Sequence, residues 1–380
     1  MKLVTFEVAT PVGRVSRIGA VLDGELEGEA RIVDLHAGYA AMLAEGGDGR
    51  AYEIAQAAMP PDMIGYLQGG QASNARAHEV LDYVRQARAL TGPTGEQLVH
   101  NRSGVRLLAP VPRPVTVRDF STYEEHSGGN PDRSAWYFYP GCYRGNPGSI
   151  RGPEDDALYP AYTDWLDPEL ELGVYINKEG RNIATKDAMD FVGGYTIYID
   201  LSARDTGPKD SLGPYKGKDF CTLTGPCLVT PDSFDENDAR CGIRVNGETW
   251  YETNVGRLRN FFTPELIAYA SDGETLLPGE LLGSGTIGLG CSITLGKWLK
   301  PGDVLEEWIE GIGTIRANVV PEINANSYVR NGITGHLSLP RWAEGFPERL
   351  RDQQAEQAKS RMIPRGPRYE RGEEPIGSRP

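Results

Sequence analysis

Along residues 1 to about 105 the hydrophobic positions follow two different periods. Residues 14–24 (RVSRIGAVLDG) and 30–35 (ARIVDL) alternate apolar and polar side chains, as β-strands do. In residues 36–46 (HAGYAAMLAEG) and 73–92 (SNARAHEVLDYVRQARALTG) the apolar positions recur every three or four residues, as on one face of a helix. The pattern therefore predicts a small α/β N-terminal domain over residues 1–105.

From about residue 106 to 340 the pattern becomes that of a β-rich domain. A proline-rich stretch, residues 107–120 (LLAPVPRPVTVRDF), leads into it, and X-Pro pairs favour extended backbone. Runs of Val, Ile, Tyr and Thr follow, separated by turns such as Asn246-Gly247, which is typical of a type I′ hairpin. We expect an α+β protein that is mostly β, with a rolled or barrel-like mixed β-sheet as its second domain. Residues 341–380 have the composition of a polar helix and a disordered tail.

Composition and charge exclude several classes of partner. The 380 residues carry a formal net charge of −14, which would repel nucleic acid and anionic membranes and suits a protein that holds divalent cations. No run of about 18 apolar residues occurs. The five cysteines are odd in number and form no C-x-x-C pair, so they are expected to be free thiols in a reducing compartment. We expect a cytoplasmic protein with no nucleic-acid or membrane partner.

The stretch Leu166 to Ile176, LDPELELGVYI, places two glutamates at the start of an apolar strand. Residues i and i+2 of a strand point to the same side about 6 to 7 Å apart, so Glu169 and Glu171 would face the same space. Such a pair is usually the solvated face of a strand. If it is buried, the repulsion reaches about 2 to 3 kcal/mol at an effective dielectric constant near 20, and a cation is then needed.

Three other stretches carry side chains that fit a site for a hard cation. Asp119 and His126 lie in VRDFSTYEEH, Asp200 ends the apolar run GGYTIYID, and Lys218 lies in GPYKGKDF. With the glutamate pair, these stretches supply four carboxylates. Oxygen donors of this kind suit Mg²⁺, Mn²⁺ or Ca²⁺, whereas zinc prefers His and Cys.

These stretches, in this order and spacing, resemble the catalytic domain of the fumarylacetoacetate hydrolase family over about residues 106–320. The same resemblance includes YPGCYRGNPGSIRGP, VNGETW, LLPGELLGSGTIGLG and LKPGDVLEEWIEGIGTI. It implies a homodimer and a small keto or diketo acid as substrate. The implied metal ligands are Asp119, Glu169, Glu171 and Asp200. The other implied roles are a general base at His126, a charged oxyanion partner at Lys218, and substrate-binding groups at Tyr143, Arg144 and Thr286.

The implied chemistry is hydrolysis of a carbon-carbon bond in an acylpyruvate or other β-diketone acid, as in the catabolism of aromatic or other ring compounds. The two substrate oxygens would chelate the metal while His126 activates water. The chain has Ser121 and Gly207 where fumarylacetoacetate-cleaving members have a tyrosine and a glutamine, so we expect a wider pocket and a substrate with a bulkier or less polar tail. No glutamate partner of His126 is evident from the sequence. Metal-dependent decarboxylation or keto-enol isomerisation, and binding of a small acid or metal without catalysis, therefore remain alternatives.

Overall fold

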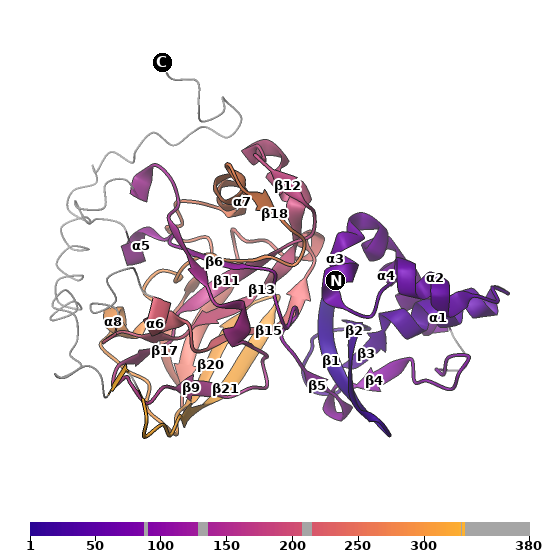
Figure 1. Ribbon diagram of the computed structural model, residues 1–380, viewed down its shortest axis with the longest axis horizontal. Helices are drawn as coiled ribbons and strands as arrows, with labels where there is room; N and C mark the ends of the chain where they lie inside the picture. Colours follow the sequence, from indigo (N-terminus) through magenta and orange to yellow (C-terminus); the bar gives the residue numbers. More distant parts are fainter. Residues whose placement is uncertain (87–89, 128–135, 207–214, 328, 331–380) are drawn as a thin grey trace, which may run out of the picture.

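The computed structural model describes residues 1–86, 90–127, 136–206, 215–327 and 329–330. Gly207 and the predicted polar helix and tail at 341–380 lie outside these residues. Within them the protein is mostly β, and a smaller N-terminal unit lies beside a larger unit (Figure 1). In the part of the chain described, no helix combines the length and the apolar character needed to cross a membrane.

The N-terminal unit is an antiparallel sheet with helices packed against it. Asp34 begins the first helix by accepting a hydrogen bond from the backbone N–H of Ala37, as an N-cap residue does. The predicted α/β character is therefore seen in this region, with two strands and two helices more than the periodicity indicated. The strands are β1 (Lys2–Thr10), β2 (Gly13–Val21), β3 (Arg31–Asp34) and β4 (Val99–Asn101), and the helices are α1 (Leu35–Glu45), α2 (Ala51–Ala58), α3 (Met63–Gln68) and α4 (Gly70–Gln86).

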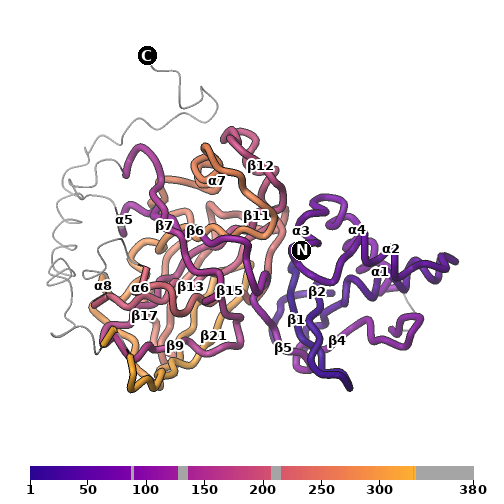
Figure 2. The backbone as a smooth tube through the Cα atoms, viewed as in Figure 1, coloured from indigo at the N-terminus to yellow at the C-terminus, as the bar shows by residue number. Residues whose placement is uncertain are grey.

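The N-terminal sheet continues into the larger unit. Strand β1 pairs with β15 through Lys2 with Val229 and Leu3 with Leu228, and Figure 2 shows the two strands side by side where the units meet. The strand order is β4-β3-β2-β1-β15-β13-β11-β19-β6-β7. The strands of the larger unit in this order are β15 (Thr222–Val229), β13 (Val192–Asp200), β11 (Leu170–Ile176), β19 (Leu281–Gly283), β6 (Val117–Phe120) and β7 (Cys142–Gly145).

A second sheet packs against the first, because β20 and β21 contact β13 and β15. Its order is β17-β16-β20-β21-β9, with bounds Glu248–Asn254, Arg240–Val245, Val304–Ile309, Gly313–Pro321 and Ala157–Tyr159. Every residue of β11 and β13 is buried, so the apolar run after Glu169 is a central strand as predicted. The mostly-β mixed fold is confirmed. Among the described strands, however, the first sheet runs from β4 to β7 and these two edge strands do not pair with each other. The sheet is therefore open and rolled, and it is not a closed barrel.

The predicted turn at Asn246-Gly247 has the expected backbone, and two Pro-Gly turns also have the backbone that their residues favour. Asn246 and Gly247 both have positive φ, 53° and 79°, as a type I′ turn between β16 and β17 requires. Gly279 and Gly302, each after a proline, have φ of 84° and 92°, as at the third position of a type II turn. The turns at Gly279 and Gly302 directly precede β19 and β20.

The remaining elements are short connections, apart from one helix of nine residues, α7. They are η1 (Arg102–Gly104), β5 (Arg106–Leu107), α5 (Glu124–Ser127), η3 (Pro147–Ser149), β8 (Ile150–Arg151), β10 (Leu166–Asp167), β12 (Gly180–Arg181), η4 (Thr185–Phe191), β14 (Ser202–Ala203), α6 (Tyr215–Lys218), η6 (Pro231–Ser233), α7 (Thr263–Ser271), β18 (Thr275–Leu276) and α8 (Ser292–Leu295).

Candidate metal centre and active site

Three carboxylates meet where neighbouring strands of the first sheet lie side by side. Asp200 ends β13, Glu171 lies in β11 and Asp119 lies in β6, and one oxygen of each lies within 4.8 Å of the others. Strand β19 runs between β11 and β6 and contributes Gly283 to this space. A Cβ atom at Gly283 would lie 2.7 Å from Glu171 Oε2 and 2.9 Å from Asp119 Oδ1, so a larger residue here would displace both carboxylates from this arrangement.

Among the described residues, one cation forms an ion pair with this three-carboxylate group (Asp119, Glu171 and Asp200): the ammonium group of Lys218, which contacts Asp200. Burial and the charge of Asp200 raise the pKa of Asp119 well above its usual range, and burial and Asp119 do the same for the pKa of Glu171. Asp119 Oδ1 and Asp200 Oδ1 are buried and lack a hydrogen-bond partner in the described structure. Buried carboxylates with free oxygen lone pairs are the donors that Mg²⁺, Mn²⁺ and Ca²⁺ bind, so this donor set fits the predicted metal.

Glu169, by contrast, is fully engaged by the protein. Its carboxylate accepts hydrogen bonds from Thr286 Oγ1 at 2.7 Å and from Ser202 Oγ at 3.0 Å, and it pairs with Lys218 Nζ at 2.6 Å and with Arg204. Burial would raise the pKa of Glu169, but Arg204 and Lys218 outweigh it and hold that pKa well below its usual range.

Of the four predicted metal ligands, Asp119, Glu171 and Asp200 thus form one group, and Glu169 lies next to that group across the ammonium group of Lys218. Glu169 precedes the first residue of β11 and forms a backbone bridge with Cys291, so the regular alternation of the strand does not extend to it. Lys218 joins the two parts, because its ammonium group also contacts Asp200. The ammonium group therefore lies between Glu169 and the three-carboxylate group.

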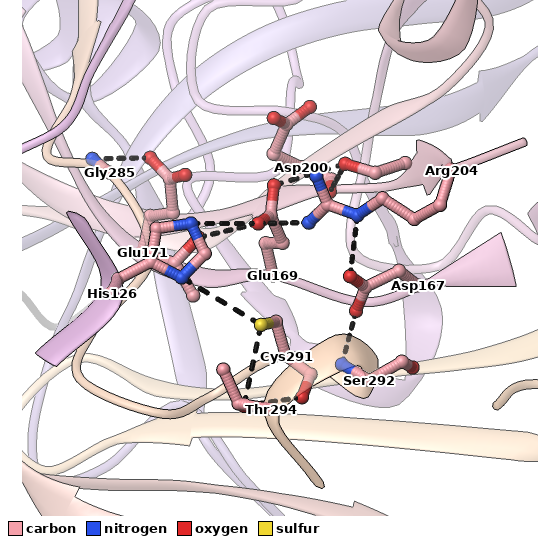
Figure 3. A network of polar contacts seen from close by, with 12 residues as sticks. His126, Asp167, Glu169, Glu171, Asp200, Arg204, Gly285, Cys291, Ser292 and Thr294 are labelled. Atoms are coloured by element: carbon pink, nitrogen blue, oxygen red, sulfur yellow. Dashed lines mark hydrogen bonds and ion pairs between the residues drawn. The ribbon is translucent and has the colours of Figure 1, made fainter. Parts of the chain in front are cut away.

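His126 lies against Glu169, as Figure 3 shows. Its Nε2 is 3.5 Å from Glu169 Oε1, and its Nδ1 is 3.8 Å from the sulfur of Cys291. These three side chains have the donor types of a second metal site. Two cations already neutralise Glu169, and burial raises the pKa of the Cys291 thiol, so the trio is better described as a hydrogen-bonding network than as a cation site.

The glutamates next to His126 in sequence are engaged elsewhere. Glu125 Oε1 accepts a hydrogen bond from Arg257 at 3.0 Å, and Glu124 Oε1 accepts one from the hydroxyl of Tyr137 at 3.4 Å. Neither Glu124 nor Glu125 is therefore shown to be the glutamate that orients His126, although both are its neighbours in sequence.

Of the three predicted substrate-binding residues, Tyr143 and Thr286 contact the clustered carboxylates and Arg144 does not. Tyr143 donates its hydroxyl to Asp200 Oδ2 at 2.8 Å, and burial and Asp200 raise the pKa of Tyr143 well above its usual range, so it remains a neutral donor. Thr286 donates a hydrogen bond from its hydroxyl to Glu169. Arg144 is not brought to the cluster. It follows Tyr143 on β7, points to the opposite side of the strand, and pairs with Glu274.

Two charged residues and a thiol at the site, Arg204, Asp167 and Cys291, were not predicted from the sequence. Arg204 Nε donates to Asp167 Oδ2 at 2.7 Å while the same guanidinium contacts Glu169, so Arg204 holds both carboxylates. Burial raises the pKa of Asp167 to about 6. The local signal for Asp167 was its i+2 spacing from Glu169. The proximity of Cys291 to His126 had no such signal, because the two residues lie far apart in the chain.

Comparison with known proteins assigns the larger unit. The family model described as "Fumarylacetoacetate (FAA) hydrolase C-terminal" matches residues 116–320, more than half of the chain. The chain is 34% identical over 268 residues to the rat protein named oxaloacetate tautomerase Fahd2a, mitochondrial, covering 69% of this chain and 81% of that protein. The human protein named oxaloacetate tautomerase FAHD2A, mitochondrial, is also 34% identical, over 270 residues, with the same two coverages of 69% and 81%.

Solved structures have the same fold. Maleylpyruvate hydrolase from Sphingobium sp. SYK-6, in complex with manganese (II) ion and pyruvate, has a TM-score of 0.61 at 23% identity and covers 85% of this chain and 100% of its own. On the family match, the extent of the relatives and the shared fold, the chain belongs to the fumarylacetoacetate hydrolase family.

Proposed function

We propose that this protein is a divalent-metal-dependent enzyme that moves a proton within an enolisable 2-keto acid, interconverting its keto and enol forms. The observation that carries this proposal is the arrangement of His126. Its imidazole pairs with Glu169, and Lys218 connects that carboxylate to the three-carboxylate group. A proton acceptor and an ammonium group thus lie at the edge of the site where a metal and its substrate would bind. The name of the rat relative, an oxaloacetate tautomerase, supports the same reaction class.

Each residue has a distinct part in this reaction. A bound Mg²⁺ or Mn²⁺ would supply Lewis acidity toward the substrate carbonyl, which makes the neighbouring C–H more acidic. His126 would accept the proton from that carbon and return it to oxygen, or carry out the reverse transfer. Lys218 would donate a hydrogen bond to the oxygen on which negative charge develops. Asp119, Glu171 and Asp200 would hold the metal, and Tyr143 would fix the carboxylate of Asp200.

Hydrolysis of an acylpyruvate is the second candidate, and family membership favours it. In that reaction His126 would activate a water molecule, and a carboxylate behind the imidazole would stabilise the imidazolium that forms. In this chain the described neighbour of Nδ1 is the Cys291 thiol. We place proton transfer first because the rat and human relatives are named oxaloacetate tautomerases.

The two reactions give different products from a panel of acids. The enol of oxaloacetate and several acylpyruvates would be followed by ultraviolet absorbance with Mg²⁺ or Mn²⁺, and the products would be separated by chromatography. Tautomerisation removes enol absorbance and leaves a single acid, whereas hydrolysis gives two acids. His126→Ala is the test variant, and His78→Ala, an exposed histidine on α4, is the matched control. If neither reaction accelerates when metal is added to the wild type, the proposed function is wrong.

A further inference from the structure

The short helix that carries His126 begins next to a turn from a distant part of the chain. Helix α5 is preceded by residues 122–123, and residues 258–260 come shortly after the end of β17. Tyr123 and Arg259 lie opposite each other there as an antiparallel β-bridge. The position of α5 therefore depends on this turn as well as on β6, the strand that leads into it.

Two backbone hydrogen bonds flank the bridge, and one of them ends on a residue with a strained backbone. The N–H of Glu124 donates to the carbonyl of Leu258 at 3.0 Å, and the N–H of Asn260 donates to the carbonyl of Thr122 at 2.8 Å. Leu258 has a φ of 50°, in the left-handed region that a residue with a side chain rarely adopts. Such a conformation persists only where the surrounding contacts hold it. The side chains next to Leu258 are therefore the ones to consider.

Arg259 supplies a contact of this kind. Its side chain is completely buried, and Nη1 donates to Glu236 Oε2 at 2.8 Å. The guanidinium carbon is 5.8 Å from the centroid of the Tyr123 ring and 5.2 Å from that of the Phe262 ring, within the range of cation–π interactions. Tyr123 is also fully buried, and its hydroxyl donates to the carbonyl of Val255 at 2.9 Å. The guanidinium thus holds the residue that lies opposite it in the bridge.

The polar contacts of this guanidinium do not satisfy all of its donors. Among the described residues, Nε and Nη2 of Arg259 are buried and lack a hydrogen-bond partner. A buried cation with unpaired N–H groups costs free energy, which the two aromatic rings offset in part. A lysine would keep the charge beside Glu236 but not the planar group that lies over the rings. Stability alone therefore gives little reason for an arginine here, whereas a fixed position of Tyr123 gives one.

We propose that Arg259 is a positioning residue whose guanidinium holds Tyr123 and the turn at Leu258, and thereby fixes α5 with His126 beside Glu169. The effect on catalysis rests on the proposed function, whereas the hold on α5 is independent of the reaction. In the described part of the chain, the polar and ring contacts of Arg259 include none of the three-carboxylate group. Arg259 would therefore act only through the position of the helix.

The test compares Arg259→Met, which removes the charge and the planar group, with Arg259→Lys, which keeps the charge. Arg244→Met is the matched control, because Arg244 also lies over an aromatic ring, that of Trp308 at 5.6 Å, but is exposed on β16. Leu305→Ala, at a fully buried position of β20 in the second sheet, controls for lost stability. Three quantities are measured for the full-length protein well below its melting transition: backbone amide hydrogen exchange, the affinity for Mg²⁺ by calorimetry, and kcat and KM on the acid that the wild type turns over.

We expect the amides of Glu124 and Asn260 to exchange at least about tenfold faster in Arg259→Met, at intermediate rates in Arg259→Lys, and at wild-type rates in Arg244→Met. A displacement of about 1 Å at a catalytic group can cost about 10²-fold in rate. We therefore expect kcat to fall about ten- to hundredfold in Arg259→Met at nearly constant KM, with a smaller loss in Arg259→Lys. The Mg²⁺ affinity should remain within about threefold of wild type in all variants, because the three-carboxylate group is unchanged.

Wild-type exchange of the Glu124 and Asn260 amides in Arg259→Met would overturn the proposal. Wild-type kcat in that variant would also overturn it, and so would an equal loss of kcat in Leu305→Ala, which would indicate a general effect of lower stability. If Arg259→Met does not fold, Arg259→Lys decides, and wild-type exchange in it would overturn the proposal because the charge alone would then suffice. If the wild type turns over none of the acids, the proposed function fails, and the exchange rates still decide whether Arg259 holds α5.

Discussion

Replacing Lys218 by methionine should strengthen metal binding while it weakens catalysis. The Lys218 ammonium lies 2.6 Å from Glu169 Oε2, contacts Asp200, and lies under the ring of Tyr143 at 5.3 Å from its centroid. It is thus an internal cation in contact with a carboxylate that is expected to bind metal. A divalent ion must either displace it from Asp200 or bind beside it, and both cost free energy.

The size of the effect follows from these contacts. Removing one partner of a buried ion pair typically destabilises a protein by about 3 to 5 kcal/mol. Arg204 would still neutralise Glu169, and Tyr143 would still donate to Asp200, so the lower end of that range applies to the metal-free variant. If a bound divalent cation restores about half of that loss, the gain is about 1.5 kcal/mol, or roughly a tenfold lower Kd.

Isothermal calorimetry with Mg²⁺ and Mn²⁺ measures this Kd for wild type, Lys218→Met and the control Lys216→Met. Lys216 is an exposed lysine on the same short helix, α6. The metal-free Lys218→Met protein should also melt at a lower temperature than wild type, and saturating metal should narrow the gap. Weaker metal binding in Lys218→Met would refute the reasoning, since Lys218 would then support the metal-loaded site instead of competing with it.

Three further predictions concern the carboxylates and the base. Glu171→Gln should weaken Mg²⁺ binding by at least tenfold, and by more than Glu169→Gln does, because Arg204 and Lys218 already compensate the charge of Glu169. Calorimetry that gives a larger loss of affinity for Glu169→Gln would contradict this prediction. The pKa values of Asp119 and Glu171 are raised, so their contribution to the stability of the metal-free protein should be fully present below their unfolded values near about 4 and be lost as the pH rises through the folded values. Urea unfolding at rising pH, with and without excess Mg²⁺, checks this, and an identical decline with metal would count against the site. His126→Ala should lower kcat by about 10²- to 10⁴-fold at unchanged metal affinity, and undiminished turnover in steady-state assays would remove the imidazole from the mechanism.

The sequence by itself determined the β-rich character of the larger unit, and it predicted the carboxylates that we propose to hold a metal. Asp119, Glu171 and Asp200 each lie in or at the end of an apolar strand, and local periodicity places such residues on a definite side of a strand. The turns at Asn246-Gly247 and after the two prolines were also predictable, because they depend on the backbone freedom of individual residues. Alternation could further have shown that Tyr143 and Arg144, as neighbours on one strand, cannot both face the site.

Only the tertiary structure decided how the charges are shared. The strand order places Gly283 between Glu171 and Asp119, brings Arg204 and Lys218 to Glu169, and places Cys291 beside both His126 and Glu169. It also pairs β1 with β15, which joins the two units through one sheet. Local spacing fixes the direction of a side chain but not its partner, because partners come from segments far apart in the chain. The free energy that distinguishes a compensated Glu169 from an uncompensated Glu171 arises from burial and from these distant charges.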